Sequence, residues 1–235
     1  MRQRNSRVLG VVLTAACVIT LMPGCGDGAA RTSDEAVASA AVVDPRALRF
    51  KEYSYTPQQT PEALAAADFV KVTAVGTVEG FREGVTYLTE PADTPYPRVY
   101  MVVRVDRAFK GAADRSVLAD GRLFVEFDRG PINTLDGKTP LNSMDVFERE
   151  VPRGTRVALF LTDAPTISNR VVNAELAPRV RTLVPHPQGL VFEDRSRSGG
   201  ERLVPGLIAP QELPGPWRAL SSLGELTNRM AKVRQ

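Results

Sequence analysis

Apolar and polar residues alternate along several short segments of the chain. Between Asp68 and Phe81, apolar residues occupy alternate positions and polar residues lie between them. The same period recurs from Arg98 to Phe109, where Lys110-Gly111 ends it. A period of two is typical of a half-buried β-strand. Further strands are predicted at 123–127, 157–161, 170–175, 180–184 and 190–193.

Two other segments follow the period of a helix. Thr60 and Pro61 supply an N-cap and a first-turn proline before a run of alanines, which predicts a short helix at 61–67. Over 219–233 the apolar residues recur every three or four positions, which predicts an amphipathic C-terminal helix. Several short strands with few helices between them indicate a mainly β domain. We expect a small antiparallel, OB-like barrel or sandwich.

The first 24 residues have the pattern of an export signal. Arg2, Arg4 and Arg7 precede an apolar run of 15 residues, Val8–Met22. This run is shorter than the roughly 20 residues that a bilayer-spanning helix needs. We therefore predict a signal peptide at 1–24 and no permanent span in this segment.

The run ends at Leu21-Met22-Pro23-Gly24-Cys25, which resembles the lipobox of bacterial lipoproteins. The resemblance implies cleavage before Cys25, a palmitate-type diacylglyceryl group on its sulfur, and attachment to the outer face of the cell membrane. Two acyl chains are enough for stable anchoring. Two alternatives stay open, namely a lipobox at Cys17 and an unmodified signal cleaved further on, after Ala30. The excess of Arg over Lys and the many Ala, Pro and Gly residues are typical of a GC-rich source such as an actinobacterium.

Composition changes again after the signal. Residues 25–47 contain no aromatic residue and are predicted to form a flexible tether, which spans about 25 Å for roughly 20 residues. A single β-rich domain is expected over 48–235.

Of the 30 basic residues, three lie in the signal, which leaves 27 basic against 27 acidic residues. Nucleic-acid binding needs clustered positive charge, so this balance argues against it.

Three short motifs lie between 62 and 162, and they are similar to segments of exported bacterial OB-like barrels. The resemblance implies a barrel over this range. Related tissue-inhibitor-like modules carry disulfides that this chain lacks, which argues against protease inhibition. The motifs are Ala67-Asp68-Phe69-Val70 leading to Val75-Gly76-Thr77-Val78, Val103-Arg104-Val105-Asp106 leading to Phe109-Lys110-Gly111, and Gly154 before Leu159-Phe160-Leu161.

Candidate chemistry is sparse in this sequence. The only histidine, His186, lies between two prolines and is predicted to be a surface residue in a turn, without partners for nucleophilic catalysis or zinc. Gly137-Lys138-Thr139 resembles the end of a phosphate-binding loop, but Gly130 precedes it at the wrong spacing, and a tight turn is expected instead. Trp217 is predicted to anchor the last helix in the core, with an exposed recognition role as the alternative. We expect no cofactor and no metal.

The longest predicted loop, 130–152, carries four acidic residues, Asp136, Asp145, Glu148 and Glu150. Their spacing matches no EF-hand, so solvated charges are expected. Loops longer than about 12–15 residues are usually functional or disordered, which makes this loop the predicted contact surface.

These patterns lead to one hypothesis and one alternative. The hypothesis is a non-enzymatic, membrane-anchored envelope lipoprotein that binds an envelope protein, a glycan or a small ligand at one rim of the barrel. The predicted rim residues are Tyr87, Tyr96, Asp136 and Asp145. The alternative is an envelope hydrolase that acts through paired carboxylates, which requires two acidic groups in one cleft.

Overall fold

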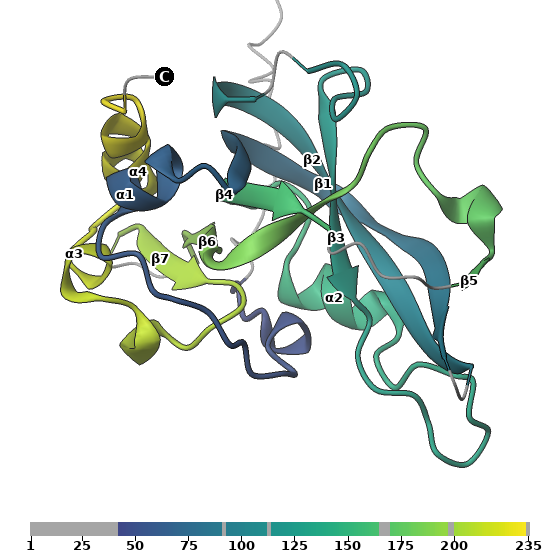
Figure 1. Cartoon of the computed structure of the whole chain (residues 1–235). Coiled ribbons are helices and arrows are strands. Elements are labelled where there is room, and N and C mark those ends of the chain that lie inside the picture. The colour runs from purple at the N-terminus through teal and green to yellow at the C-terminus, as the bar shows by residue number, and fades with distance from the viewer. Residues whose placement is uncertain (1–41, 91–92, 112–113, 165–169, 197–199, 234–235) are drawn as a thin grey trace, which may run out of the picture. The chain divides into compact units, whose positions relative to one another are not determined.

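The computed structural model describes residues 42–233 except 91–92, 112–113, 165–169 and 197–199. The chain divides into two units. The first, Met1–Ala36, lies wholly outside the described residues, and so do the predicted signal peptide and Cys25. All described residues belong to the second unit, Val37–Gln235 (Figure 1).

The second unit is mainly β, as predicted. Its strands are β1 (Val70–Thr89), β2 (Thr94–Lys110), β3 (Arg122–Asp128), β4 (Arg156–Asp163), β5 (Arg170–Val172), β6 (Leu183–Asp194) and β7 (Arg202–Pro205). Its α-helices are α1 (Pro61–Ala66), α2 (Met144–Glu150), α3 (Gly215–Arg218) and α4 (Leu223–Met230). Three 3-10 turns complete it, η1 (Arg46–Leu48), η2 (Ala174–Leu176) and η3 (Pro210–Glu212).

Five strands form a ring in the order β1-β2-β3-β6-β4, and β4 pairs again with β1. All neighbours are antiparallel except β3 and β6, which run parallel and share a single residue pair, Val125 with Leu183. A five-stranded barrel that is partly open at one seam is the architecture of the OB fold. Of the predicted barrel or sandwich, the structure therefore confirms a mainly β domain with a small, barrel-like closed sheet. Strands β5 and β7 lie outside the ring and pair with β1 and β6.

Two apolar clusters hold the domain together. The first fills the ring, because inward positions such as Val99, Met101 and Val103 on β2 alternate with outward ones. The second lies on the outer face of β1 and β4, where Val75 and Phe160 meet side chains of α1, α3 and α4. Burial of these apolar surfaces is the main favourable term in folding. The second cluster includes Leu64, Trp217, Leu223, Leu226 and Met230.

Several predicted boundaries are corrected by the structure. The C-terminal helix is shorter than 219–233, because Ser222 caps α4 by accepting a hydrogen bond from the Glu225 N–H (3.1 Å). The strands predicted at 180–184 and 190–193 are one continuous strand, β6. The predicted 130–152 loop contains helix α2, which buries Phe147 in the ring core. Strand β7 was not predicted.

Packing also begins earlier than the predicted domain boundary at residue 48. Val43 and Ala47 are buried in the first cluster. The backbone N–H of Asp44 donates to the carbonyl oxygen of Glu150 at 3.0 Å. The described end of the predicted tether is therefore part of the domain, because α2 offers it an apolar surface and a backbone partner.

Candidate functional site

The long β1–β2 pair extends beyond the closed ring, and β5 adds a third strand to this extension. Tyr87 on β1 lies directly opposite Tyr96 on β2 and directly opposite Val171 on β5. Residues that face each other across antiparallel strands project from the same face of the sheet. We call these three residues the tyrosine row. Its outer members are accessible, since Tyr96 is 42% exposed and Val171 is 43% exposed.

A buried carboxylate lies on the same outer face, next to the tyrosine row. Glu126 on β3 is 2% exposed although it points away from the ring core. Arg98 Nε donates to Glu126 Oε1 at 2.8 Å, and the Thr182 hydroxyl donates to Oε2 at 2.7 Å. A buried charge is costly unless it is paired and hydrogen-bonded, and both conditions are met here. We call Arg98, Glu126 and Thr182 the carboxylate cluster.

Arg98 joins the carboxylate cluster to the tyrosine row. Its guanidinium lies 5.8 Å from the centroid of the Tyr87 ring, within the range of a cation–π contact. Arg98 Nη1 also lies 3.8 Å from Asp128 Oδ2. On β2, Tyr96, Arg98 and Tyr100 occupy alternate positions and therefore share one face. The row and the cluster thus form one continuous surface across β5, β1, β2 and β3.

Tyr87 and Tyr100 have raised pKa values. Burial, followed by the Glu126 charge, raises the pKa of Tyr100 to about 12. Burial and the same carboxylate also raise the pKa of Tyr87. Tyr87 therefore presents a neutral phenol at neutral pH, which can donate a hydrogen bond and stack, whereas Tyr100 is 1% exposed and lies beneath the surface. The surface is suited to recognition by hydrogen bonding and aromatic contact.

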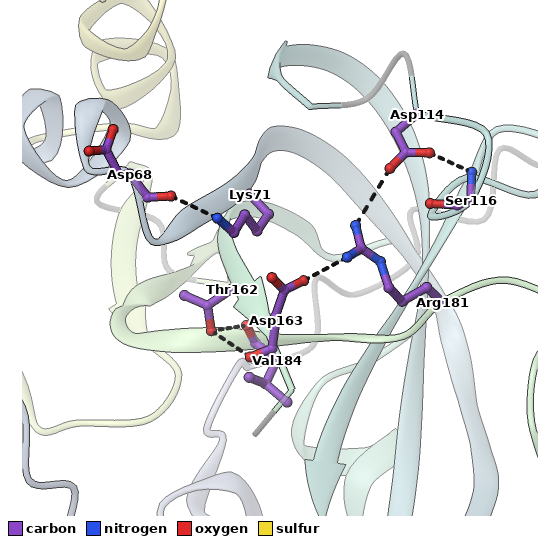
Figure 2. Close-up of polar contacts among 8 residues, drawn as sticks. All are labelled: Asp68, Lys71, Asp114, Ser116, Thr162, Asp163, Arg181 and Val184. Carbon is purple, nitrogen blue, oxygen red and sulfur yellow. Dashed lines mark hydrogen bonds and ion pairs between the residues drawn. The ribbon is translucent and has the colours of Figure 1, made fainter. Parts of the chain in front are cut away.

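Arg181 holds the end of the β5–β6 segment that lies directly before β6 (Figure 2). Arg181 Nη1 lies 2.8 Å from Asp163 Oδ1, and Nη2 lies 3.5 Å from Asp114 Oδ2. The Arg181 backbone N–H donates to the carbonyl oxygen of Ser116 at 2.6 Å. These side chains are about half exposed, and such ion pairs contribute little individually. Together with the neighbouring Thr182, however, they determine where the segment crosses the barrel.

The structure places the four predicted rim residues at three positions. Tyr87 and Tyr96 come together in the tyrosine row. Asp136 lies in an exposed turn, where its carboxylate accepts hydrogen bonds from the backbone N–H groups of Lys138 and Thr139, both at 2.9 Å. These hydrogen bonds, with that of the Thr139 side chain first, lower the pKa of Asp136 to about 2. Asp145 is exposed in the first turn of α2. Among the described residues, no hydrogen bond or ion pair joins either acid to the tyrosines.

The acidic residues of segment 130–152 are engaged separately. Asp136 stabilises its own turn, and Glu150 Oε2 accepts the backbone N–H of Ala47 at 2.5 Å. Glu148 and Asp145 are exposed on α2. In the described part of the chain, no group of three or more His, Cys, Asp or Glu side chains has the geometry to hold a metal ion.

Two single-residue predictions have different outcomes. His186 is 8% exposed within β6, and its ring stacks on Phe69 (5.4 Å) and meets the edge of Tyr55 (5.4 Å). The prediction of a surface histidine in a turn is wrong, because the flanking prolines continue the strand. Trp217 is confirmed as a core anchor. It is 3% exposed, packs on Phe160, and donates from Nε1 to the Gln58 carbonyl oxygen at 3.0 Å.

Sequence reasoning missed the carboxylate cluster entirely. Glu126 lies between apolar Val125 and Phe127 in an alternating strand, a pattern that predicts a solvent-exposed acid. Its burial depends on Arg98 and Thr182, which are 28 and 56 residues away. No local signal identifies these partners.

No protein-family model, curated protein or solved structure gives a significant match to the chain. In the described residues, no helix is long and apolar enough to cross a membrane.

Proposed function

We propose that this chain is an exported bacterial lipoprotein, anchored through Cys25 to the outer face of the cell membrane, that binds a glycan of the cell envelope without transforming it. The observation that carries the binding role is the tyrosine row. Two side chains that are each more than two-fifths exposed, Tyr96 and Val171, flank Tyr87 in register on one sheet face.

The position of this surface favours a glycan. OB folds bind oligonucleotides and oligosaccharides on the outer face of their second and third strands, next to the loops that follow the first and fourth strands. Tyr96 and Arg98 on β2 and Glu126 on β3 lie at the corresponding strands, beside the β1–β2 hairpin and the β4–β6 connection. The neutral charge balance after the signal argues against an oligonucleotide. An extended oligosaccharide fits an open sheet face with aromatic, guanidinium and phenol groups.

The anchoring is tested with the Cys25→Ala variant of the full-length chain. We expect it to leave the membrane fraction or to accumulate as an uncleaved precursor, and to take up no labelled palmitate. Unchanged attachment and processing would exclude Cys25 as the anchor, whatever the outcome for ligand binding.

The binding role is tested by co-sedimentation of the full-length chain with purified envelope polysaccharide. Tyr96→Ala is expected to weaken binding about tenfold, within the roughly 1–3 kcal/mol that an aromatic stacking contact contributes in other binding faces. Phe69→Ala is the matched control, since Phe69 is 44% exposed but lies before β1 and away from the row. Equal binding by the wild type and Tyr96→Ala would contradict the proposed surface.

A further inference from the structure

A cavity of about 300 Å³ lies at the opposite end of the β1–β2 pair from the tyrosine row. It is bounded by the end of α1, by α4 and the residues after it, and by the strand positions where Thr73 on β1 pairs with Lys110 on β2. Its walls are mostly apolar. The lining residues include Ala66, Thr73, Phe109, Lys110, Met230 and Val233.

The Thr73 hydroxyl is the unusual feature of this cavity. Thr73 is fully buried, and its Oγ1 makes no hydrogen bond to any described residue. It occupies an outward position on β1, two residues before Val75, and therefore faces the helices and not the ring core. Leaving a buried hydroxyl without a partner is costly, so such a group calls for a specific explanation.

The mouth of the cavity carries one positive and one negative side chain. The Lys110 ammonium donates to the Ala67 carbonyl oxygen at 2.9 Å and to that of Ala65 at 3.4 Å. Its three protons leave one donor available. Asp68 uses its main-chain carbonyl to accept from Lys71 at 3.0 Å, and its carboxylate is directed away from that contact (Figure 2). One cation and one anion at the mouth give the site no net charge.

We propose that this cavity binds a small neutral amphipathic molecule whose hydroxyl or carbonyl group hydrogen-bonds to Thr73. The apolar walls formed by Met230, Val233 and Phe109 cover the body of the ligand. Since a water occupies about 30 Å³ of liquid, the cavity has room for roughly ten non-hydrogen atoms. This size is at the lower end of the range of ligand pockets. The site is independent of the proposed glycan surface.

The test uses methyl NMR of the full-length chain with ¹³C-labelled methionine and octan-1-ol as the probe. Met230 lines the cavity and is 1% exposed, whereas Met101 lies inside the ring and serves as an internal control. We expect saturable shifts of the Met230 methyl signal and a constant Met101 signal. Octanoate and octylammonium, added at the same concentrations, are expected to bind more weakly because the mouth has no net charge.

Two variants complete the test. Thr73→Val keeps the shape of the side chain, and we expect about tenfold weaker binding of octan-1-ol. The thermal midpoint of this variant should be equal to or above that of the wild type, because no internal hydrogen bond is lost. Ala66→Leu places a larger side chain at the exposed end of α1 and is expected to abolish the Met230 shifts.

Four results would overturn the proposal. The first is a Met230 signal that no alcohol moves, and the second is a shift of Met230 together with Met101. The third is equal affinity of the wild type and Thr73→Val for octan-1-ol. The fourth is tighter binding of either charged probe, which would contradict a neutral ligand.

Discussion

Removal of Arg98 should destabilise the domain far more than removal of an ordinary surface arginine. Glu126 is 2% exposed and lies 2.8 Å from Arg98 Nε. Two unit charges about 4 Å apart interact by about 4 kcal/mol at an effective dielectric constant of about 20. Removing one partner of a buried pair leaves an uncompensated charge and costs about 3–5 kcal/mol. We expect Arg98→Met to lower the free energy of unfolding by that amount.

The measurement is urea unfolding of the full-length variants, followed by the fluorescence of Trp217, the only tryptophan. Arg104→Met is the matched control. Arg104 lies on the same strand, its side chain is 55% exposed, and it pairs with Asp106 at 2.9 Å, so we expect a cost below about 1 kcal/mol. The double variant Arg98→Met/Glu126→Gln should be more stable than Arg98→Met, because the buried charge is then removed.

Two results would refute this reasoning. The first is a cost of Arg98→Met no greater than that of Arg104→Met, in which case Glu126 is solvated and the cluster is not a buried pair. Alternatively, Glu126→Gln could fail to restore any stability in the double variant. That outcome would show that the loss comes from the packing of Arg98 on Tyr87 and not from the unpaired charge.

Three further predictions concern other parts of the domain. Burial lowers the pKa of His186 from 6.5 to about 4. Between about pH 4 and pH 6.5 the unfolded chain therefore binds more protons than the folded one, and the free energy of unfolding falls as the pH is lowered through this window. His186→Phe should therefore lose less stability than the wild type between pH 7 and pH 4.5 in urea titrations, and equal losses would contradict the assignment. Gly111 has φ +72°, and a Cβ added there would clash with the Lys71 carbonyl oxygen. Gly111→Ala should therefore lower the free energy of unfolding clearly more than Gly121→Ala, where φ is +76° but the surrounding space is open. Calorimetry that ranks the two variants equally would contradict this. Trp217→Phe removes one indole hydrogen bond, and we expect a loss of about 1 kcal/mol or more in urea unfolding, whereas an unchanged midpoint would exclude the anchoring role.

Much of the barrel could be predicted because its strands have a local signature. The inward residues Val99, Met101 and Val103 alternate with outward ones, and this alternation is visible without any knowledge of the partners. Helix α1 was predictable for a similar reason, since Thr60 accepts a hydrogen bond from the Ala63 N–H only three residues away.

The errors occurred where distant contacts override local signals. Pro185 and Pro187 favoured a turn, but β4 pairs with Pro185 through Leu161 and the strand continues. Helix α2 was missed within a polar segment because its stability depends on burial of Phe147 in the ring core. Local propensity is a weak prior when tertiary packing acts against it.

The candidate site shows the same division. Tyr87 and Tyr96 were selected from the sequence, but their alignment with Val171 depends on the pairing of β1 with both β2 and β5. The sequence by itself determined most of the strands, the amphipathic helix and the barrel class, because these follow from periods of two and of three to four residues along the chain. Only the tertiary structure decided the strand register, the burial of Glu126 and the cavity at Thr73, because each depends on groups that are distant in the sequence and meet only after the ring has closed.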